Sequence, residues 1–255
     1  LLDHGLRLSS HTTRHKRPTD RTYPNPTSSI GDAYCAQTPK TNLMHILVIG
    51  ASGRVGSTLT EKLLQANHTV VGTTRREEPV FELPNYSQIQ LDLSADQASI
   101  TRKIPDNLDA VYFTSGSGGE NLLQVDLHGA IKTMKAAEEK GVSKYIMLST
   151  IFATQPEKWQ DVLPEIMYDY YVAKLYADEW LKNQTSLDYT ILQPGALKEE
   201  DGHGTISTQV EEPGENPIED VAQTLMEVLQ NPNASKKVIT MHSGKKPIPE
   251  AIGAL

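Results

Sequence analysis

The chain has 255 residues, and its 38% hydrophobic content is sufficient to build a folded core. Its 32 Asp and Glu residues outnumber its 24 Lys and Arg residues, and the resulting formal net charge of −8 disfavours nucleic acid as a partner, because phosphates attract Lys and Arg. A single cysteine, Cys35, excludes an internal disulfide, and no apolar run is long enough for a membrane span, so we expect a cytoplasmic protein with no membrane partner.

The first 43 residues differ in character from the rest of the chain. Residues 1–41 contain eleven Ser and Thr and four Pro, without apolar periodicity of either helix or strand. Met44 is the first methionine and stands directly before the first strand pattern. We therefore expect residues 1–43 to be a disordered or non-native tail, with an organelle transit peptide as the alternative, and residues 44–255 to form a single domain.

From Met44 onward, strand patterns alternate with polar or helical stretches. A short apolar run is followed by a glycine turn and a helical pattern that breaks at Asn67, and three further strands come next. The predicted elements are a strand at His45–Ile49, a helix at Val55–Leu64, and strands at Thr69–Thr74, Gln88–Leu91 and Ala110–Phe113.

The alternation continues through the second half of the chain and weakens after Gly195. We predict a helix at Leu122–Glu139 ended by Gly141, a strand at Lys144–Leu148, a helix at Tyr170–Lys182, a strand at Tyr189–Leu192, a strand at Thr205–Val210, a helix at Ile218–Leu229 and a strand at Lys237–Met241. This order predicts an α/β fold with a Rossmann-like, doubly wound parallel sheet and a small C-terminal substrate-side region. The substrate side would come mainly from residues 152–167 and 196–255.

The segment Gly50–Gly56 reads GASGRVG and lies between the first strand and the first helix. Gly50 permits a tight turn, Gly53 lets the backbone approach a pyrophosphate, and Gly56 lets the helix pack closely on the strand. The free N–H groups at the helix start face the bound anion. The turn therefore predicts a dinucleotide site that includes Ser52, Arg54 and Val55.

The end of the second strand indicates which dinucleotide is bound. An NAD enzyme usually places an acidic residue there for the ribose 2′-hydroxyl, whereas this chain has Arg75 and Arg76. Either guanidinium can bind a 2′-phosphate through charge-assisted hydrogen bonds. We therefore expect the cofactor to be NADP, with NAD as the alternative. The two arginines could instead belong to a solvated loop that binds no cofactor, because Glu77 and Glu78 follow them.

Four segments resemble the atypical short-chain dehydrogenase/reductase superfamily, in particular its small NAD(P)H-binding members related to flavin and biliverdin reductases and to NmrA-type regulators. They are the glycine turn, Asp92, the stretch Tyr145–Thr150 and the stretch Tyr171–Leu197, in which Gln193 replaces the arginine usual in that family. The resemblance implies that Asp92, Leu93, Thr114, Ser115, Gly116, Pro194, Gly195 and Leu197 line the cofactor. Asp92 could alternatively be a residue at a helix N-terminus near Ser94.

Tyr170 and Lys174 have the i, i+4 spacing that places both on one helix face, and Ser149 and Thr150 end the preceding strand. This pattern is similar to the Ser-Tyr-Lys catalytic set of the superfamily. A nearby ammonium stabilises a tyrosinate, so Tyr170 could exchange a proton with a substrate while Ser149 or Thr150 holds the substrate oxygen. In the alternative interpretation, the tyrosines of this stretch only pack.

The favoured function is that of an NADP-dependent oxidoreductase that transfers a hydride between a nicotinamide and a small carbonyl, quinone or flavin substrate. One alternative is a non-catalytic NAD(P)-binding sensor of the NmrA type, and another is an enzyme related to nucleotide-sugar epimerases and dehydratases. We expect no metal site, because the histidines are scattered and have no ligand spacing. We expect a monomer or a homodimer.

Overall fold

The computed structural model describes residues 42–162 and 164–255. The prediction of a disordered or non-native tail falls on residues outside this range, apart from residues 42 and 43, and so does Cys35. Among the described residues, no helix is both long and apolar enough to cross a membrane.

In the described part of the chain, nine strands form one sheet in the order β11-β8-β10-β6-β5-β4-β1-β2-β3. Seven strands run parallel: β1 (His45–Ile49), β2 (Thr69–Thr74), β3 (Tyr86–Gln90), β4 (Ala110–Phe113), β5 (Lys144–Leu148), β6 (Asp188–Pro194) and β10 (Lys237–Ser243). The short strands β8 (Thr205–Ser207) and β11 (Lys246–Pro247) extend one edge antiparallel. A separate parallel pair joins β7 (Ala196–Lys198) to β9 (Glu215–Pro217).

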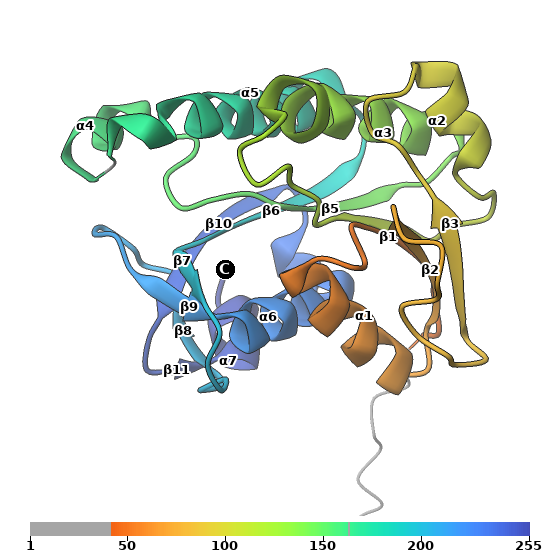
Figure 1. The fold of residues 1–255 in the computed structure, drawn as a ribbon. Coiled ribbons are helices and arrows are strands. Elements are labelled where there is room, and N and C mark those ends of the chain that lie inside the picture. The colour runs from red at the N-terminus through yellow and green to blue at the C-terminus, as the bar shows by residue number, and fades with distance from the viewer. Residues whose placement is uncertain (1–41, 163) are drawn as a thin grey trace, which may run out of the picture. The chain divides into compact units, whose positions relative to one another are not determined.

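Helices cover both faces of the sheet (Figure 1). One layer contains α2 (Gln97–Lys103), α3 (His128–Glu139), α4 (Trp159–Val162) and α5 (Tyr168–Gln184). The other contains α1 (Arg54–Gln65), α6 (Ile218–Gln230) and α7 (Ile248–Gly253). Short turns of helix complete the elements: η2 (Pro156–Lys158), η3 (Glu165–Met167) and η4 (Pro232–Ala234). The doubly wound, Rossmann-like sheet predicted from the sequence is confirmed.

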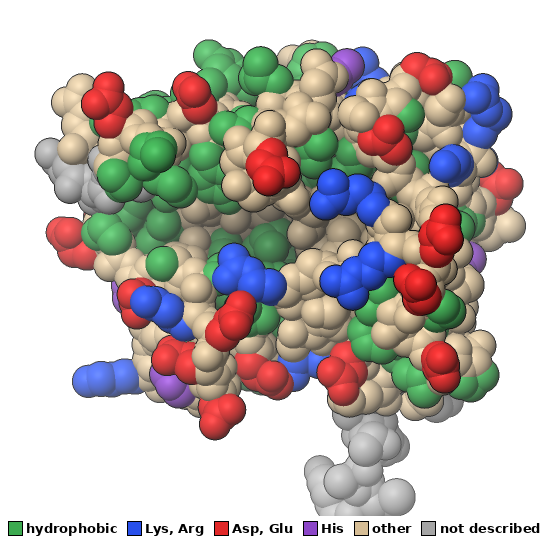
Figure 2. All heavy atoms as spheres, in the orientation of Figure 1, with side chains coloured by type: hydrophobic (Ala, Val, Ile, Leu, Met, Phe, Trp, Pro, Cys, Tyr) green, Lys and Arg blue, Asp and Glu red, His purple; other side chains and the backbone are tan. Residues whose placement is uncertain are grey.

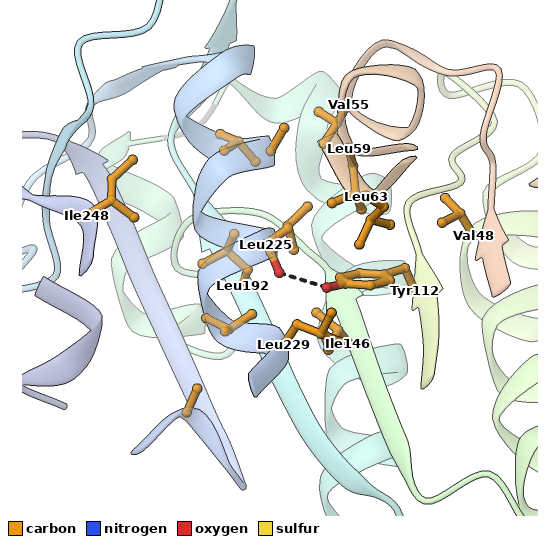
Figure 3. Close-up of a cluster of buried hydrophobic side chains, with 14 of the residues drawn as sticks. Val48, Val55, Leu59, Leu63, Tyr112, Ile146, Leu192, Leu225, Leu229 and Ile248 are labelled. Atoms are coloured by element: carbon orange, nitrogen blue, oxygen red, sulfur yellow. Dashed lines mark hydrogen bonds between the residues drawn. The ribbon is translucent and has the colours of Figure 1, made fainter. Parts of the chain in front are cut away.

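The central strands are buried on both faces, which explains why β1 and β4 consist of uninterrupted apolar residues. Their side chains contribute to two core clusters, one under each helical layer. Figure 3 shows the cluster beneath α6, where the hydroxyl of Tyr112 on β4 donates a 2.8 Å hydrogen bond to the carbonyl of Leu225 on α6. This bond satisfies the polar end of a fully buried tyrosine.

The structure corrects several predicted elements. The segment predicted as one helix, Leu122–Glu139, begins as a π-helix, η1 (Leu122–Leu127), and becomes α-helical only at His128. The predicted Gly141 ending is confirmed, with a φ of 70° at that glycine. The third strand lies two residues earlier than predicted at its start, the strand expected at Thr205–Val210 ends at Ser207, and α5 begins at Tyr168.

Elements that the sequence pattern did not reveal are short or lack apolar periodicity. Helix α2 is seven residues long, and its start is fixed by Asp96, whose carboxylate accepts a bond from the Ser99 backbone N–H. The other elements missed are β7, β9, β11, α4 and α7. A strand of two or three residues has no readable alternation, because its pattern spans a single period.

The strand order places the site. The chain moves outward from β1 through β2 to β3, then returns to β4 on the other side of β1 and continues to β5 and β6. The crevice beyond the carboxyl ends of β1 and β4 is thus the switch point at which ligands bind in open α/β sheets. Gly50 follows β1 there, and Thr114 follows β4.

Candidate functional site

Most residues predicted from the sequence to bind the cofactor or to act in catalysis follow directly on the carboxyl end of a parallel strand. In chain order, the glycine turn follows β1, Arg75 and Arg76 follow β2, Asp92 and Leu93 follow β3, Thr114 to Gly116 follow β4, Ser149 and Thr150 follow β5, and Pro194 to Leu197 end β6 and enter β7. Tyr170 and Lys174 come from α5. The carboxyl ends of parallel strands share one edge of the sheet, so the fold gathers these residues from segments distant in sequence.

The glycine turn is packed against the segments that follow β2 and β4. Gly50 has a φ of 91°, in the region that favours glycine, and its N–H donates to the Thr73 hydroxyl. A β-carbon at Gly56 would lie 2.1 Å from the Gly50 carbonyl oxygen and 2.7 Å from the Thr114 hydroxyl. Gly50 and Gly56 are therefore required by the packing of the turn itself.

Gly53 differs from Gly50 and Gly56 because no contact inside the protein requires a glycine at this position. Its φ is −79°, and a β-carbon there would meet only the Gly50 carbonyl, at 3.2 Å. Gly53 is exposed and is the N-cap of α1, and no side chain caps this helix start. An uncapped helix start flanked by a bare glycine fits an anionic pyrophosphate, which can approach the backbone N–H groups closely.

Three arginines stand around this turn. Arg54 is the first residue of α1, and its guanidinium lies 3.7 Å from the Glu199 carboxylate across the site. Arg75 and Arg76 are exposed, and neither forms an ion pair with any residue in the described ranges. Figure 2 shows a hollow between the two helical layers on this face, with Lys or Arg side chains on its rim. Exposed guanidinium groups beside a helix N-terminus favour a ligand that carries phosphate.

Asp92 forms a local turn with Ser94. Its carboxylate accepts bonds of 2.9 Å from the Ser94 N–H and 2.6 Å from the Ser94 hydroxyl, and these bonds hold the pKa of Asp92 below its usual value. Helix α2 is capped by Asp96, so Asp92 is not the cap of that helix. Asp92 is exposed at the edge of the site, whereas Leu93 is buried.

The segment after β4 connects the glycine turn to η1. The Thr114 hydroxyl donates to the Ile49 carbonyl, and a β-carbon at Gly50 would lie 2.9 Å from Ser115. Gly116 faces the buried Asp126 of η1, whose carboxylate accepts a bond from the Ser117 N–H. This segment is thus held between the turn and the π-helix.

The backbone at the end of β6 is fully engaged with neighbouring segments. The Pro194 carbonyl accepts a bond from the Ile151 N–H, and the Gly195 N–H lies within bonding distance of both the Met241 carbonyl and the Asn216 side chain. A β-carbon at Gly195 would lie 2.2 Å from the Gly214 carbonyl oxygen. These contacts direct the chain into β7, where Leu197 is partly buried against the core beneath α1 and α6.

The predicted catalytic residues are brought together at the carboxyl end of β5. Lys174 is buried, its ammonium donates a 3.1 Å bond to the Leu148 carbonyl, and its Nζ atom lies 5.8 Å from the centre of the Tyr170 ring. Tyr170 is half-buried. Thr150 is also half-buried, and its hydroxyl lies 3.4 Å from the hydroxyl of Tyr171. Ser149 is buried, and its hydroxyl contacts another residue of α5.

The Ser149 hydroxyl donates a 2.7 Å hydrogen bond to the carboxylate of Asp178 on α5. Gln193 on β6 donates a second bond, of 2.9 Å, to the same carboxylate oxygen, and its amide oxygen accepts a bond from Thr240. Burial raises the pKa of Asp178 to about 6, although the bonds from Ser149 and Gln193 act in the opposite direction. Asp178 and Gln193 are both fully buried.

Sequence reasoning missed Asp178 and identified Gln193 only as a lost charge. The signal for Asp178 was present, because Tyr170, Lys174 and Asp178 follow one another at intervals of four and so share one face of α5.

Within the described ranges, no three His, Cys, Asp or Glu side chains are grouped so as to hold a metal ion.

The family model described as NAD(P)H-binding matches residues 50–232. The chain belongs to this NAD(P)H-binding family. The uncharacterised sugar epimerase YhfK of Bacillus subtilis is 35% identical over 221 residues, which cover 83% of this chain and all of the relative.

Two solved structures show the same fold. The oxidoreductase ylbE of Lactococcus lactis is 41% identical, with a TM-score of 0.78 over 83% of this chain and 96% of that one. A short-chain dehydrogenase/reductase of Veillonella parvula, solved in complex with NADP, is 18% identical, with a TM-score of 0.62 over 80% of this chain and 96% of that one. The matched region begins at Gly50, the first residue of the glycine turn.

Proposed function

We propose that the protein is an NADPH-dependent reductase of a small carbonyl, quinone or flavin substrate. The observation that carries the proposal is the uncapped start of α1 behind Gly53, surrounded by Arg54, Arg75 and Arg76 at the switch point of the sheet. The name of the Lactococcus relative, an oxidoreductase, and the NADP held by the Veillonella structure support the same class of activity.

The residues present fit a dinucleotide phosphate. The N–H groups at the start of α1 would bind the pyrophosphate, and Arg75 or Arg76 would bind the 2′-phosphate. Asp92 and Leu93 would lie beside the adenosine, and Thr114, Ser115 and Gly116 would line the middle of the cofactor. Pro194, Gly195 and Leu197 would flank the nicotinamide end, close to Lys174. When bound, NADPH supplies the hydride.

The chain supplies the proton that must accompany that hydride. The Tyr170 phenol would donate it to the developing alkoxide of the substrate, and the Lys174 ammonium would stabilise the tyrosinate that remains. The Lys174 side chain is held in place by its bond to the Leu148 carbonyl. Of the two hydroxyls considered, that of Thr150 is the better placed to hold the substrate oxygen, because Ser149 is buried and bonded to Asp178.

Calorimetric titration with NADPH and NADH tests the cofactor without a known substrate. We expect NADPH to bind more tightly than NADH, and we expect Arg75→Ala or Arg76→Ala to weaken NADPH binding by about 1 to 3 kcal/mol while leaving NADH binding unchanged. Lys135→Ala, on α3, is a matched control for the loss of one positive charge. Equal weakening of both nucleotides would contradict a role in 2′-phosphate recognition.

Tyr170→Phe distinguishes carbonyl reduction from flavin reduction. Hydride transfer to an isoalloxazine needs no phenol, so we expect the variant to lose reduction of a carbonyl probe by about 10²- to 10⁴-fold and to keep any NADPH-dependent reduction of flavin mononucleotide. Carbonyl reduction at the wild-type rate would overturn the role of Tyr170. NADPH binding without turnover of any probe would instead support a non-catalytic sensor.

A second candidate function, that of a sugar epimerase, is supported by the names of two relatives, from Bacillus subtilis and Bacillus halodurans. Such an enzyme would bind a nucleotide sugar beside the nicotinamide end of the cofactor. Binding of UDP-glucose with an affinity comparable to that of NADPH would favour this candidate over the reductase.

A further inference from the structure

We propose that Asp178 is a positioning residue, which fixes Ser149 with its proton turned inward and leaves Thr150 as the hydroxyl presented to substrate. The role of Asp178 in a reaction rests on the proposed reductase function, whereas its contacts with Ser149 and Gln193 are independent of it. Asp178 lies behind the group that would touch the substrate, so it acts through its neighbours.

The geometry of α5 places Asp178 behind the catalytic pair. Residues four apart lie above one another on a helix, so Tyr170, Lys174 and Asp178 form one row. Along this row burial increases, from the half-buried Tyr170 to Lys174 at 4% exposure and Asp178 at 0%. The row thus runs from a half-buried residue into the interior of the protein, and the buried acid lies two turns from the Tyr170 phenol.

The direction of the Ser149 hydrogen bond follows from charge. An ionised carboxylate only accepts hydrogen bonds, so at 2.7 Å the single proton of Ser149 points toward Asp178. While this bond is made, Ser149 cannot donate to a substrate oxygen. Thr150, the next residue, is half-buried, and the neighbour of its hydroxyl is the Tyr171 phenol at 3.4 Å, a contact at the long limit for a hydrogen bond. Of these two hydroxyls, only that of Thr150 is left for substrate.

The partner of Asp178 on β6 is neutral. Gln193 donates to the same oxygen as Ser149, while the second oxygen, Oδ1, is buried without a hydrogen-bond partner. The charged groups that act on Asp178 are Lys174 and Lys182, one turn before and one turn after it on α5, and Lys182 is itself paired with Glu179. The residues that contact it from β5 and β6, Ser149 and Gln193, carry no charge.

This arrangement makes the direction of the Ser149 bond depend on protonation. When Asp178 is ionised, Ser149 must donate to it; when Asp178 is protonated, its hydroxyl can donate to Ser149 and the serine proton is released. Because the pKa of Asp178 is about 6, this change falls within the range accessible to kinetic measurement. A purely structural acid would not alter the pH profile of the reaction.

The kinetic experiment uses the full chain, NADPH, and 1,4-naphthoquinone as the probe. We expect wild-type kcat to fall as pH decreases below about 6. In Asp178→Asn, we expect kcat at pH 7 to be roughly 10- to 100-fold lower and the KM for NADPH to be unchanged. We also expect the variant to lose this fall of kcat at acidic pH, the acid limb of the profile. We expect Thr150→Ala to reduce kcat more than Ser149→Ala. An acid limb retained in Asp178→Asn, or a larger loss in Ser149→Ala than in Thr150→Ala, would overturn the proposal.

A second measurement does not require turnover. Carboxyl ¹³C resonances of labelled aspartate, with Asp178 assigned by its absence in Asp178→Asn, report protonation directly. We expect a midpoint near pH 6 that moves upward in Ser149→Ala, because a donated bond stabilises the carboxylate. A midpoint near the usual value for aspartate, or one unmoved in Ser149→Ala, would overturn the positioning role. If wild type reduces no probe but this titration is observed, the reductase proposal fails and the contact network stands.

Discussion

A β-carbon at Gly56 would lie 2.1 Å from the carbonyl oxygen of Gly50, within one strand-turn-helix unit. Both atoms belong to the backbone framework, so neither can move aside without displacing α1 from β1. We expect Gly56→Ala to destabilise the fold by about 1 to 3 kcal/mol or more, through forced repacking. Urea denaturation of the variant checks this, and wild-type stability would show that the turn is more pliable than its contacts indicate.

Gly53→Ala is the matched comparison at the same turn. Its backbone φ of −79° suits any residue, and the nearest atom to a new β-carbon is 3.2 Å away, so we expect a change in stability of less than about 1 kcal/mol. The added methyl group would stand at the start of α1, where we propose that the pyrophosphate binds. We therefore expect folded protein with NADPH binding weakened by at least tenfold in calorimetry. Unchanged affinity would place the phosphates elsewhere.

Glu199 lies opposite the cofactor turn, with its carboxylate 3.7 Å from the Arg54 guanidinium. Both side chains are largely exposed, at 61% for Arg54 and 73% for Glu199, so their pairing contributes little to folding. The carboxylate nevertheless competes with a phosphate for Arg54. We expect Glu199→Gln to tighten NADPH binding by about two- to fivefold at low salt and to leave stability unchanged. Weaker binding in this variant would show that Glu199 contacts the nucleotide favourably.

Tyr112 connects the central strand β4 to α6 through its bond to the Leu225 carbonyl (Figure 3). Tyr112→Phe removes one hydroxyl from a fully buried position without changing the ring. We expect a loss of about 1 kcal/mol of unfolding free energy and no change in NADPH affinity, because the bond lies in the core beneath α6. A large change in affinity would indicate that α6 transmits strain to the site.

The fold was predictable where burial imposes a pattern. The strands β1, β2, β4 and β5 have the predicted bounds, because each carries a run of residues that the sheet buries on both faces. The short elements after Gly195 were not predictable, since β7, β9 and β11 owe their form to backbone pairing with distant segments. The π-helix at η1 gives no periodic signal distinct from the α-helix that follows it.

The placement of the glycine turn could be predicted from the sequence, whereas the contacts behind the predicted catalytic residues could not. Gly50 and Gly56 are required by the packing of the turn, and Gly53 completes the spacing of the motif at the exposed start of α1. The direction of the Ser149 hydroxyl is set by its bond to Asp178, 29 residues later, a contact made only in the folded chain. Gln193, noted from sequence as a missing charge, is an uncharged partner that donates a hydrogen bond to the Asp178 carboxylate.

Asp178 and Asp188 should respond to pH in opposite directions. Burial raises the folded-state pKa of Asp178 to about 6, above the usual 3.8, so its contribution to stability is greatest below pH 3.8 and is lost as pH rises through 6. For Asp188, burial acts upward, but bonds from Ser235 and Lys144 outweigh it and lower the pKa. Its contribution is therefore present above pH 3.8 and is lost as pH falls.

Asparagine at either position removes the titration while keeping an acceptor oxygen. At pH 7.5 we expect Asp178→Asn to raise the unfolding free energy by about 1 to 3 kcal/mol, and Asp188→Asn to lower it by up to about 1 kcal/mol, since Asp188 is one-third exposed. Toward pH 4 both differences should shrink, which urea titrations at the two pH values would measure. The same Asp178→Asn change is expected to slow turnover. A variant that is more stable at neutral pH yet less active would show that the buried charge of Asp178 raises kcat and lowers the free energy of unfolding. A loss of stability at pH 7.5 would instead mean that the ionised carboxylate is held favourably by Ser149 and Gln193.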